Sequence, residues 1–217
     1  MEAKKQKIRR DVLTSSYKAG ACHIGSALSC VDILVDLYYK ILKKGDIFIF
    51  GKASGVATLY AILEDKGIIT DAWRYLKKYP LPSQEVPTVI HSFGSLGHAL
   101  PFACGVAYAK PKTRVYVLIG DAEIQEGTTY ESALFARHHN IKNLNIICDW
   151  NGIQACGFTK DICGLSTALE FLKKTFPQFQ AIKTKKGNGV KFMENSVDWH
   201  YMNLTKDTLK EALNGLA

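Results

Sequence analysis

The middle of the sequence alternates short apolar segments with one helix-like segment, and this order restricts the fold more than any other feature. Residues 114–119 and 144–148 are almost continuously apolar, and each has the length of a single strand. Residues 128–139, between them, have the hydrophobic periodicity of a helix. Strands that are apolar on both faces and alternate with helices are typical of a parallel sheet. The sequence therefore predicts an α/β fold, a parallel sheet with helices on both faces.

Other segments carry further helix and strand signals. Ser29 followed by Asp32 resembles a capping box, which predicts a helix from there to about residue 42. The helix over 128–139 is expected to turn three larger side chains inward, namely Tyr130, Leu134 and Phe135. The remaining expected helices cover about 5–18, 55–65, 70–79, 97–110, 165–175 and the residues after Thr205, and further strands are expected at 47–50 and 179–184. A length of 217 residues without a repeat or a low-complexity linker predicts one domain over residues 1–217.

The charge balance excludes some classes of function. The chain has 28 Lys and Arg against 20 Asp and Glu, a net charge of +8, which favours anionic ligands of any kind. The charges are scattered and form no basic stripe with interleaved aromatic residues, so nucleic-acid binding is not expected. No apolar run approaches the roughly 20 residues of a membrane span, and no signal peptide is recognisable. We therefore expect a cytoplasmic protein without a membrane partner.

The cysteines give no sign of a metal centre. The chain has six of them, and they include no C-x-x-C pair and no paired metal-ligand spacing. Several stand among apolar residues, as Cys148 does. We therefore expect reduced, buried thiols.

Polar residues follow the two central strands at the point where each strand ends. Asp121 comes after the first strand, and Asn151 comes after the second, thirty residues later. The carboxyl ends of parallel strands meet at one edge of the sheet, where ligands bind. A carboxylate, an amide oxygen and a nearby carbonyl make an oxygen site that suits Mg²⁺ with phosphate. The alternative is structural: Asp121 caps a helix, and Asn151 with Gly152 forms a turn.

The wider pattern around these residues is similar to that of a known family. Residues 120–127, Gly-Asp-Ala-Glu-Ile-Gln-Glu-Gly, followed by Asn-Gly-Ile-Gln at 151–154, resemble the thiamine-diphosphate motif G-D-G…N of transketolase-like enzymes. Ala122 replaces the second glycine. Other segments resemble family motifs in the same order, and these are residues 20–26 (S-G-H-x-G), 94–98 (T-G-S-L-G-Q), 186–195 (K-G-x-G-V-x-F-M-E) and 199–200 (W-H-G).

The resemblance implies a set of cofactor ligands. Asp121, Asn151 and the carbonyl of Ile153 would hold Mg²⁺, and Asn151 would also contact the cofactor. Residues expected to approach the diphosphate are Gly120 and Ala122. Residues expected to lie against the aminopyrimidine ring are Gly94 and Leu96.

The resemblance also implies proton-transfer and interface residues. His23 and His200 match histidines that face the thiazolium ring and the reacting oxygens of the substrate, where neutral imidazoles can move protons. Glu126 and Glu131 match acidic positions at a subunit interface that couples paired active sites. His138 and His139, together, have no counterpart in the family and are interpreted as favourable charges at a helix C-terminus.

The sequence departs from the family at three places. The family commonly has Ser-Lys-Gly-His after the first short strand, whereas this chain has Gly-Lys-Ala-Ser at 51–54, so Ser54 stands where a histidine is expected. A histidine motif before residue 94 has no clear match, and His91 is not a convincing one. The segment between residues 158 and 183 is shorter than usual by about one strand and helix. These departures make ordinary pentose-phosphate substrates doubtful.

The resemblance implies a two-chain enzyme. Thiamine-diphosphate enzymes of this family activate the cofactor with a glutamate of a separate pyrimidine-binding domain, and no segment of this chain resembles that domain. We therefore expect the N-terminal, diphosphate-binding subunit of a split transketolase, which forms a complex with two copies of each chain and transfers a two-carbon ketol unit between anionic sugars. Alternatives are a related enzyme acting on an unusual sugar or a 2-oxo acid, and a catalytically silent regulatory subunit.

Overall fold

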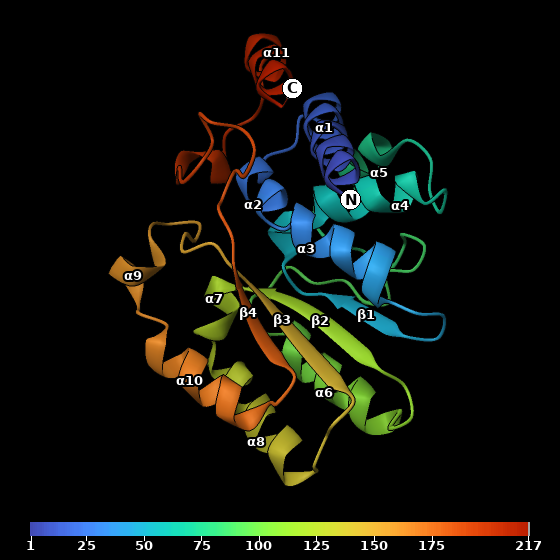
Figure 1. Ribbon diagram of the computed structural model, residues 1–217, viewed down its shortest axis with the longest axis vertical. Coiled ribbons are helices and arrows are strands. Elements are labelled where there is room, and N and C mark those ends of the chain that lie inside the picture. Colours follow the sequence, from blue (N-terminus) through green and yellow to red (C-terminus); the bar gives the residue numbers. More distant parts are fainter. Residues whose placement is uncertain (217) are drawn as a thin grey trace.

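Four parallel strands form the centre of the molecule (Figure 1). The computed structural model describes residues 1–216. Strands β1 (Ile47–Phe50), β2 (Val115–Gly120), β3 (Leu144–Trp150) and β4 (Phe179–Lys183) lie in that order across one sheet, and each neighbouring pair is parallel. Each connection between consecutive strands contains at least one helix, so all four strands end at the same edge. The predicted parallel α/β sheet is confirmed.

Helices cover both faces of this sheet, which explains why its central strands are apolar throughout. Successive side chains of a strand point to opposite faces. Val115, Val117 and Ile119 belong to one hydrophobic cluster, while Tyr116 and Leu118 belong to the other. The first cluster is completed by α6 (Ala99–Ala109), α8 (Gly127–His138) and α10 (Ser166–Thr175). The second is completed by α1 (Glu2–Ala19), α2 (Ile24–Ser29), α3 (Val31–Asp36), α4 (Val56–Asp65), α5 (Ala72–Lys78) and α11 (Lys206–Gly215).

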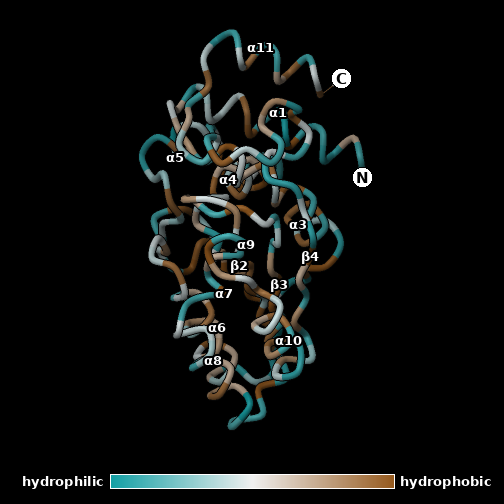
Figure 2. Tube along the Cα trace, turned by 90° about the vertical axis from the view of Figure 1, so that its left-hand side faces the viewer, coloured by the Kyte–Doolittle hydropathy of each residue, from teal (hydrophilic) through white to brown (hydrophobic). Residues whose placement is uncertain are grey.

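The two helix layers lie on either side of the apolar strands when the molecule is seen from the side (Figure 2). The tube is brown, and therefore hydrophobic, at β2 in the middle of the molecule. Among the described residues, the longest helix is α1, which carries basic side chains and packs on the core along one side only. No helix within residues 1–216 is both long enough and apolar enough to cross a membrane.

The helix predicted from Ser29 to about residue 42 is present as α3 and the turn that follows it, but its predicted cap at Ser29 is wrong and its last part is not an α-helix. Ser29 is the last residue of α2, and Cys30 separates α2 from α3. Residues Leu37–Ile41 form the wider π turn η1. Ser29 caps no helix, because its hydroxyl contacts Asp149, and the Asp32 carboxylate pairs with a buried arginine of α1. The other predicted helices and strands match observed elements to within about one helical turn.

The predicted orientation of α8 is also wrong. Leu134 is 64% exposed and Phe135 is 39% exposed, and Tyr130 is only partly buried. The buried residues of α8 are small, namely Thr129, Ser132, Ala133 and Ala136. They pack against α6, whose buried side chains are also mostly small, so the two helices approach closely. This close packing leaves the larger apolar side chains of α8 on the surface.

The cysteines are only partly as expected. All six are free, and Cys30, Cys104 and Cys148 are buried. Cys156 and Cys163 are exposed, in the segment that contains the short helix α9 (Thr159–Ile162). The expectation of buried thiols is therefore wrong for these two residues.

Candidate functional site

A cleft of about 310 Å³ opens at the edge where the strands end. The turn η2 (Ala53–Gly55) follows β1, the short helix α7 (Asp121–Ile124) follows β2, and a turn at Asn151 follows β3. The cleft also receives side chains from the start of α2 and from the turn η3 (Asp198–His200). All nine residues predicted for metal, cofactor or proton transfer line it, namely His23, Gly94, Leu96, Gly120, Asp121, Ala122, Asn151, Ile153 and His200.

Asp121 is buried in this cleft, and one of its carboxylate oxygens has no hydrogen-bond partner within the described residues. Its side chain is 4% exposed. Oδ2 accepts hydrogen bonds from the backbone N–H of Gly152 (2.6 Å) and the hydroxyl of Thr159 (2.9 Å). Oδ1 is buried and accepts no hydrogen bond within the described residues. Burial raises the pKa of Asp121, although nearby Lys52 opposes this shift. A buried carboxylate oxygen without a hydrogen-bond partner is costly, so this position fits a bound cation or another hydrogen-bond donor.

Asn151 presents its amide oxygen at the same place. Its Oδ1 accepts the backbone N–H of Ile153 at 2.9 Å, and its Nδ2 donates to the hydroxyl of Ser29 at 3.3 Å. The described residues contain no cluster of three or more His, Cys, Asp or Glu side chains that could hold a metal. The available donor set is instead a carboxylate, an amide and a backbone carbonyl, all oxygen. That set fits Mg²⁺ and does not favour a transition metal.

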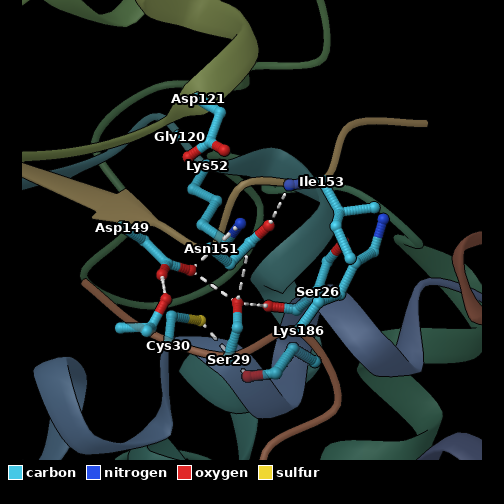
Figure 3. Close-up of polar contacts among 12 residues, drawn as sticks. Ser26, Ser29, Cys30, Lys52, Gly120, Asp121, Asp149, Asn151, Ile153 and Lys186 are labelled. Carbon is cyan, nitrogen blue, oxygen red and sulfur yellow. Dashed lines mark hydrogen bonds and ion pairs between the residues drawn. The ribbon is translucent and has the colours of Figure 1, made fainter. Parts of the chain in front are cut away.

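A buried ion pair lies beneath these ligands (Figure 3), and the sequence did not predict it. Lys52 is 7% exposed, and its Nζ lies 3.1 Å from Oδ2 of the fully buried Asp149. Ser29 and Thr184 both donate their hydroxyls to Asp149. Burial lowers the pKa of Lys52, but Asp149 and other nearby groups raise it further, so its net pKa is above the ordinary value. Lys52 therefore brings a positive charge close to the cleft.

Gly120 lies next to that charge. A Cβ atom on Gly120 would lie 3.6 Å from Nζ of Lys52, so the lysine head is directly behind the backbone at the end of β2. The signal in the sequence is the polar residue that closes each apolar strand, Lys52 after β1 and Asp149 near the end of β3. This signal identifies the ion pair only once the order of the strands in the sheet is known.

His23 and His200 meet at the other side of the cleft. Their ring centroids are 4.8 Å apart. Nδ1 of His200 lies 3.1 Å from Nζ of Lys186, and because an ammonium group only donates, Nδ1 accepts and the ring carries its proton on Nε2. Burial, together with Lys186 and His23, lowers the pKa of His200 to about 3. Burial and Lys186 also lower the pKa of His23, so both imidazoles are neutral at pH 7.

Lys186 contacts two residues of the cleft, and its role was not predicted from the sequence. Its side chain is fully buried, and Nζ donates to the carbonyl of Gln154 at 2.9 Å. Burial, with Lys52 as the next contribution, lowers the pKa of Lys186 to about 8. Lys52 in the lining of the cleft and Lys186 behind His200 and Gln154 give this region two buried lysines, which suits an anionic ligand.

The neutral state of His200 predicts a pH dependence of stability. The unfolded chain protonates His200 near its ordinary pKa of 6.5, whereas the folded pKa is about 3. Between these values the unfolded state holds the extra proton, so the free energy of unfolding falls as the pH is lowered from 6.5 towards 3. His200→Gln is expected to weaken this dependence. Urea unfolding at about pH 7 and about pH 4.5 measures it, and equal losses in variant and wild type would contradict the assignment.

Glu126 and Glu131 lie outside the cleft. Glu126 precedes α8, and Glu131 lines a separate surface groove of about 300 Å³ between α6 and α8. The other residues of this groove are Pro101, Cys104, Gly105, Thr128, Ser132 and Phe135. Leu134 and Tyr108 are also exposed on these two helices. The structure therefore places Glu131 at a partly apolar surface, whereas Glu126 lies next to Glu123, a residue of the cleft.

The turn after β1 explains one of the departures from the family pattern. A Cβ atom on Gly51 would lie 2.4 Å from Cβ of Ala99 and 2.9 Å from the carbonyl oxygen of Leu118. The usual serine therefore does not fit at this position without movement of α6. Ser54 lines the cleft where the family has a histidine, so this wall of the cleft is shorter and carries no imidazole.

Comparisons with known proteins show the family of this chain. The family described as "Thiamine pyrophosphate enzyme, C-terminal TPP binding domain" matches residues 67–216. The chain is 32% identical to an apulose-4-phosphate transketolase subunit of Actinobacillus succinogenes, over 100% of this chain and 95% of that protein. It is 30% identical to the protein of the same description from Phocaeicola vulgatus, over 98% of this chain and 92% of that protein.

A solved structure shows the same fold in a longer protein. The transketolase of Leishmania mexicana superimposes with a TM-score of 0.87 at 19% identity, and the match covers 97% of this chain and 40% of that one. The fold is therefore that of a domain of thiamine-diphosphate enzymes. Within that class, the chain belongs to the thiamine pyrophosphate enzyme family and groups with its transketolase subunits.

Proposed function

We propose that this chain is the diphosphate-binding subunit of a split transketolase, and that residues 1–217 form one such domain. The observation that carries the proposal is the unpartnered Oδ1 of Asp121, buried in a cleft that is also lined by Asn151, two neutral histidines and Lys52. A site of this kind fits a divalent cation bound to an anionic cofactor. The relatives are transketolase subunits, which supports thiamine diphosphate as that cofactor.

The residues of the cleft divide into three groups in this proposal. Asp121, Asn151 and the carbonyl of Ile153 would hold Mg²⁺. Gly120 and Ala122 would lie against the diphosphate, with the charge of Lys52 behind them. The exposed side of the cleft would receive the aminopyrimidine ring against Gly94 and Leu96. When bound, thiamine diphosphate supplies a carbon centre that accepts and then releases a two-carbon unit.

His200 and His23 would move the protons of the reaction. Breaking the bond between C2 and C3 of a ketose requires loss of the proton from the C3 hydroxyl, and forming the new bond requires a proton on the aldehyde oxygen of the acceptor. A neutral imidazole has one ring nitrogen with a free lone pair, so His23 would take the proton of the C3 hydroxyl and, as the resulting imidazolium, return a proton to the aldehyde oxygen of the acceptor. His200, with its proton on Nε2, would donate a hydrogen bond to the same oxygens. Lys186 fixes this tautomer through Nδ1. The ring centroids of the two histidines lie 4.8 Å apart and both line the cleft, which supports a shared role in these steps.

His200→Ala is expected to lower turnover by about 10²–10⁴, the usual effect of removing a positioned acid or base. The melting temperature is expected to stay close to that of the wild type, because His200 is only partly buried and is held in a short 3-10 turn. Steady-state ketol-transfer assays and thermal melts measure the two quantities. Normal turnover in the folded variant would show that His200 is a packing residue.

The partner in this proposal is a C-terminal subunit that carries the pyrimidine domain, in an assembly of two copies of each chain. The exposed apolar side chains of α6 and α8 support it, because a surface with Leu134, Phe135 and Tyr108 exposed favours association. Glu131, at the edge of this surface, would lie in the interface. We further propose that the assembly is cytoplasmic and binds neither membrane nor nucleic acid.

The substrates are proposed to be phosphorylated or otherwise anionic sugars. Two relatives are described as acting on apulose 4-phosphate, and Ser54 in place of the usual histidine supports a substrate other than the common pentose phosphates. The test is a ketol-transfer assay of the chain with its partner subunit, with apulose 4-phosphate or a pentose phosphate as donor. Cleavage of a 2-oxo acid alone would favour the decarboxylase alternative, and cofactor binding without turnover of any donor would favour a regulatory subunit.

A further inference from the structure

Ser29 is buried beneath the cleft and is not one of the residues proposed to bind the cofactor or to move protons. It is the last residue of α2, and its side chain is fully buried. Its Oγ lies 2.5 Å from Oδ2 of Asp149, 3.0 Å from the carbonyl oxygen of Ser26 and 3.3 Å from Nδ2 of Asn151 (Figure 3). Ser29 thus connects the buried ion pair to a residue of the cleft.

The chemistry of these neighbours decides what the hydroxyl does. A hydroxyl group has one proton to donate and two lone pairs that accept. The carboxylate of Asp149 and the carbonyl of Ser26 can only accept, so the proton of Ser29 points to one of them. Towards Asn151, the oxygen of Ser29 can therefore only accept. The atom of Asn151 that faces Ser29 must be the NH₂ group.

The other end of the Asn151 amide leads to the same orientation. The backbone N–H of Ile153 can only donate, and it lies 2.9 Å from Oδ1 of Asn151. Rotating the amide by 180° would place its oxygen against the acceptor side of Ser29 and its NH₂ group against the N–H of Ile153. Both hydrogen bonds would be lost at a partly buried position. Two independent neighbours therefore keep Oδ1 on the side where it can bind a cation.

We propose that Ser29 is a positioning residue that fixes the amide of Asn151 with its oxygen towards the metal. This inference rests on the proposed function of the cleft. Asp149 enforces the role of Ser29 by taking its proton, and Asp149 is itself held by Lys52 at 3.1 Å and by the hydroxyl of Thr184. Ser29 touches neither cofactor nor substrate in this arrangement and acts only through Asn151.

The test is the Mg²⁺ affinity of the complex that the complete chain forms with its partner, measured by titration calorimetry at saturating thiamine diphosphate. Ser29→Ala is expected to weaken Mg²⁺ binding by about 10- to 100-fold, the usual effect of removing an outer partner of a metal ligand. Ser29→Thr keeps a hydroxyl and is expected to restore the affinity to within a few-fold of the wild type. If Ser29→Ala does not fold, Ser29→Cys, a weak acceptor of similar size, is expected to show a smaller loss in the same direction.

Thr184→Val is the matched control. It removes the other hydroxyl that donates to Asp149 but leaves Ser29 and Asn151 in contact, so Mg²⁺ affinity is expected to change little. Equal losses in Thr184→Val and Ser29→Ala would mean that Ser29 acts only by supporting Asp149, which overturns the inference. Unchanged affinity in Ser29→Ala, or a loss in Ser29→Thr as large as in Ser29→Ala, overturns it as well. Failure of the wild type to bind Mg²⁺ and thiamine diphosphate would instead overturn the proposed function.

Discussion

Asp121→Ala is expected to abolish Mg²⁺-dependent binding of thiamine diphosphate. Asp121 directly follows β2 and lines the cleft, and its Oδ1 has no hydrogen-bond partner within the described residues. Without it, the repulsion between diphosphate oxygens is no longer balanced by a well-held cation. A loss of at least about 10²-fold in affinity corresponds to about 3 kcal/mol, a moderate value for one charged ligand.

Two further variants separate metal binding from folding. Asp121→Asn can still accept hydrogen bonds from Gly152 and Thr159 and is expected to fold, but it lacks the charge and should also bind Mg²⁺ weakly. Asp161→Ala removes an exposed carboxylate on α9 and is expected to change nothing. Calorimetry on the assembled enzyme measures all three variants. Unchanged cofactor affinity in folded Asp121→Ala would remove the metal assignment.

The second large effect is expected from the chain without a partner. Alone, it should show no ketol transfer even at saturating thiamine diphosphate and Mg²⁺. The described residues place only two carboxylates along the cleft, Asp121 and Glu123. Glu123 is buried and accepts the backbone N–H of Gly120 at 2.8 Å, and burial raises its pKa to about 7. Neither carboxylate is free to activate an aminopyrimidine ring at the open side of the cleft.

The cofactor is also expected to bind the lone chain weakly. Leu96 is 47% exposed at the side proposed for the aminopyrimidine ring, so that ring would remain partly in water. Burying an aromatic ring of this size contributes about 2–3 kcal/mol, which corresponds to a roughly 10²-fold difference in affinity between chain and complex. Mixing the purified chain with its partner and assaying both activity and affinity tests this. Full activity of the chain alone would overturn the split-enzyme proposal.

Much of the fold could be predicted because the sheet is buried on both faces. The continuous apolar runs at β2 and β3 follow directly from two helix layers, and their ends placed Asp121 and Asn151 at one edge. The orientation of α8 could not be predicted in the same way. Hydrophobicity alone suggests that Leu134 and Phe135 point inward, whereas close packing of small residues against α6 decides the buried face.

The sequence predicted residues that line the candidate site, but it did not predict the buried residues that support them. Lys52, Asp149 and Lys186 act from beneath or beside the cleft, and their partners are far away in the sequence. Lys52 and Asp149 are separated by almost half the chain, so no local pattern links them. Ser29 resembles a helix cap in the sequence because capping and buried networks use the same residue types. Only the three-dimensional contacts distinguish the two uses.

The outward face of α8 has a consequence for how the cell must make this protein. Leu134 and Phe135 are exposed beside Tyr108 while the chain is unassembled, and copies made in excess of the partner would present this surface to one another. Exposed apolar surface on unassembled chains promotes aggregation. If the proposed partner covers this surface, we expect the cell to make the two chains in matched amounts. Copies made in excess would be lost by precipitation or proteolysis.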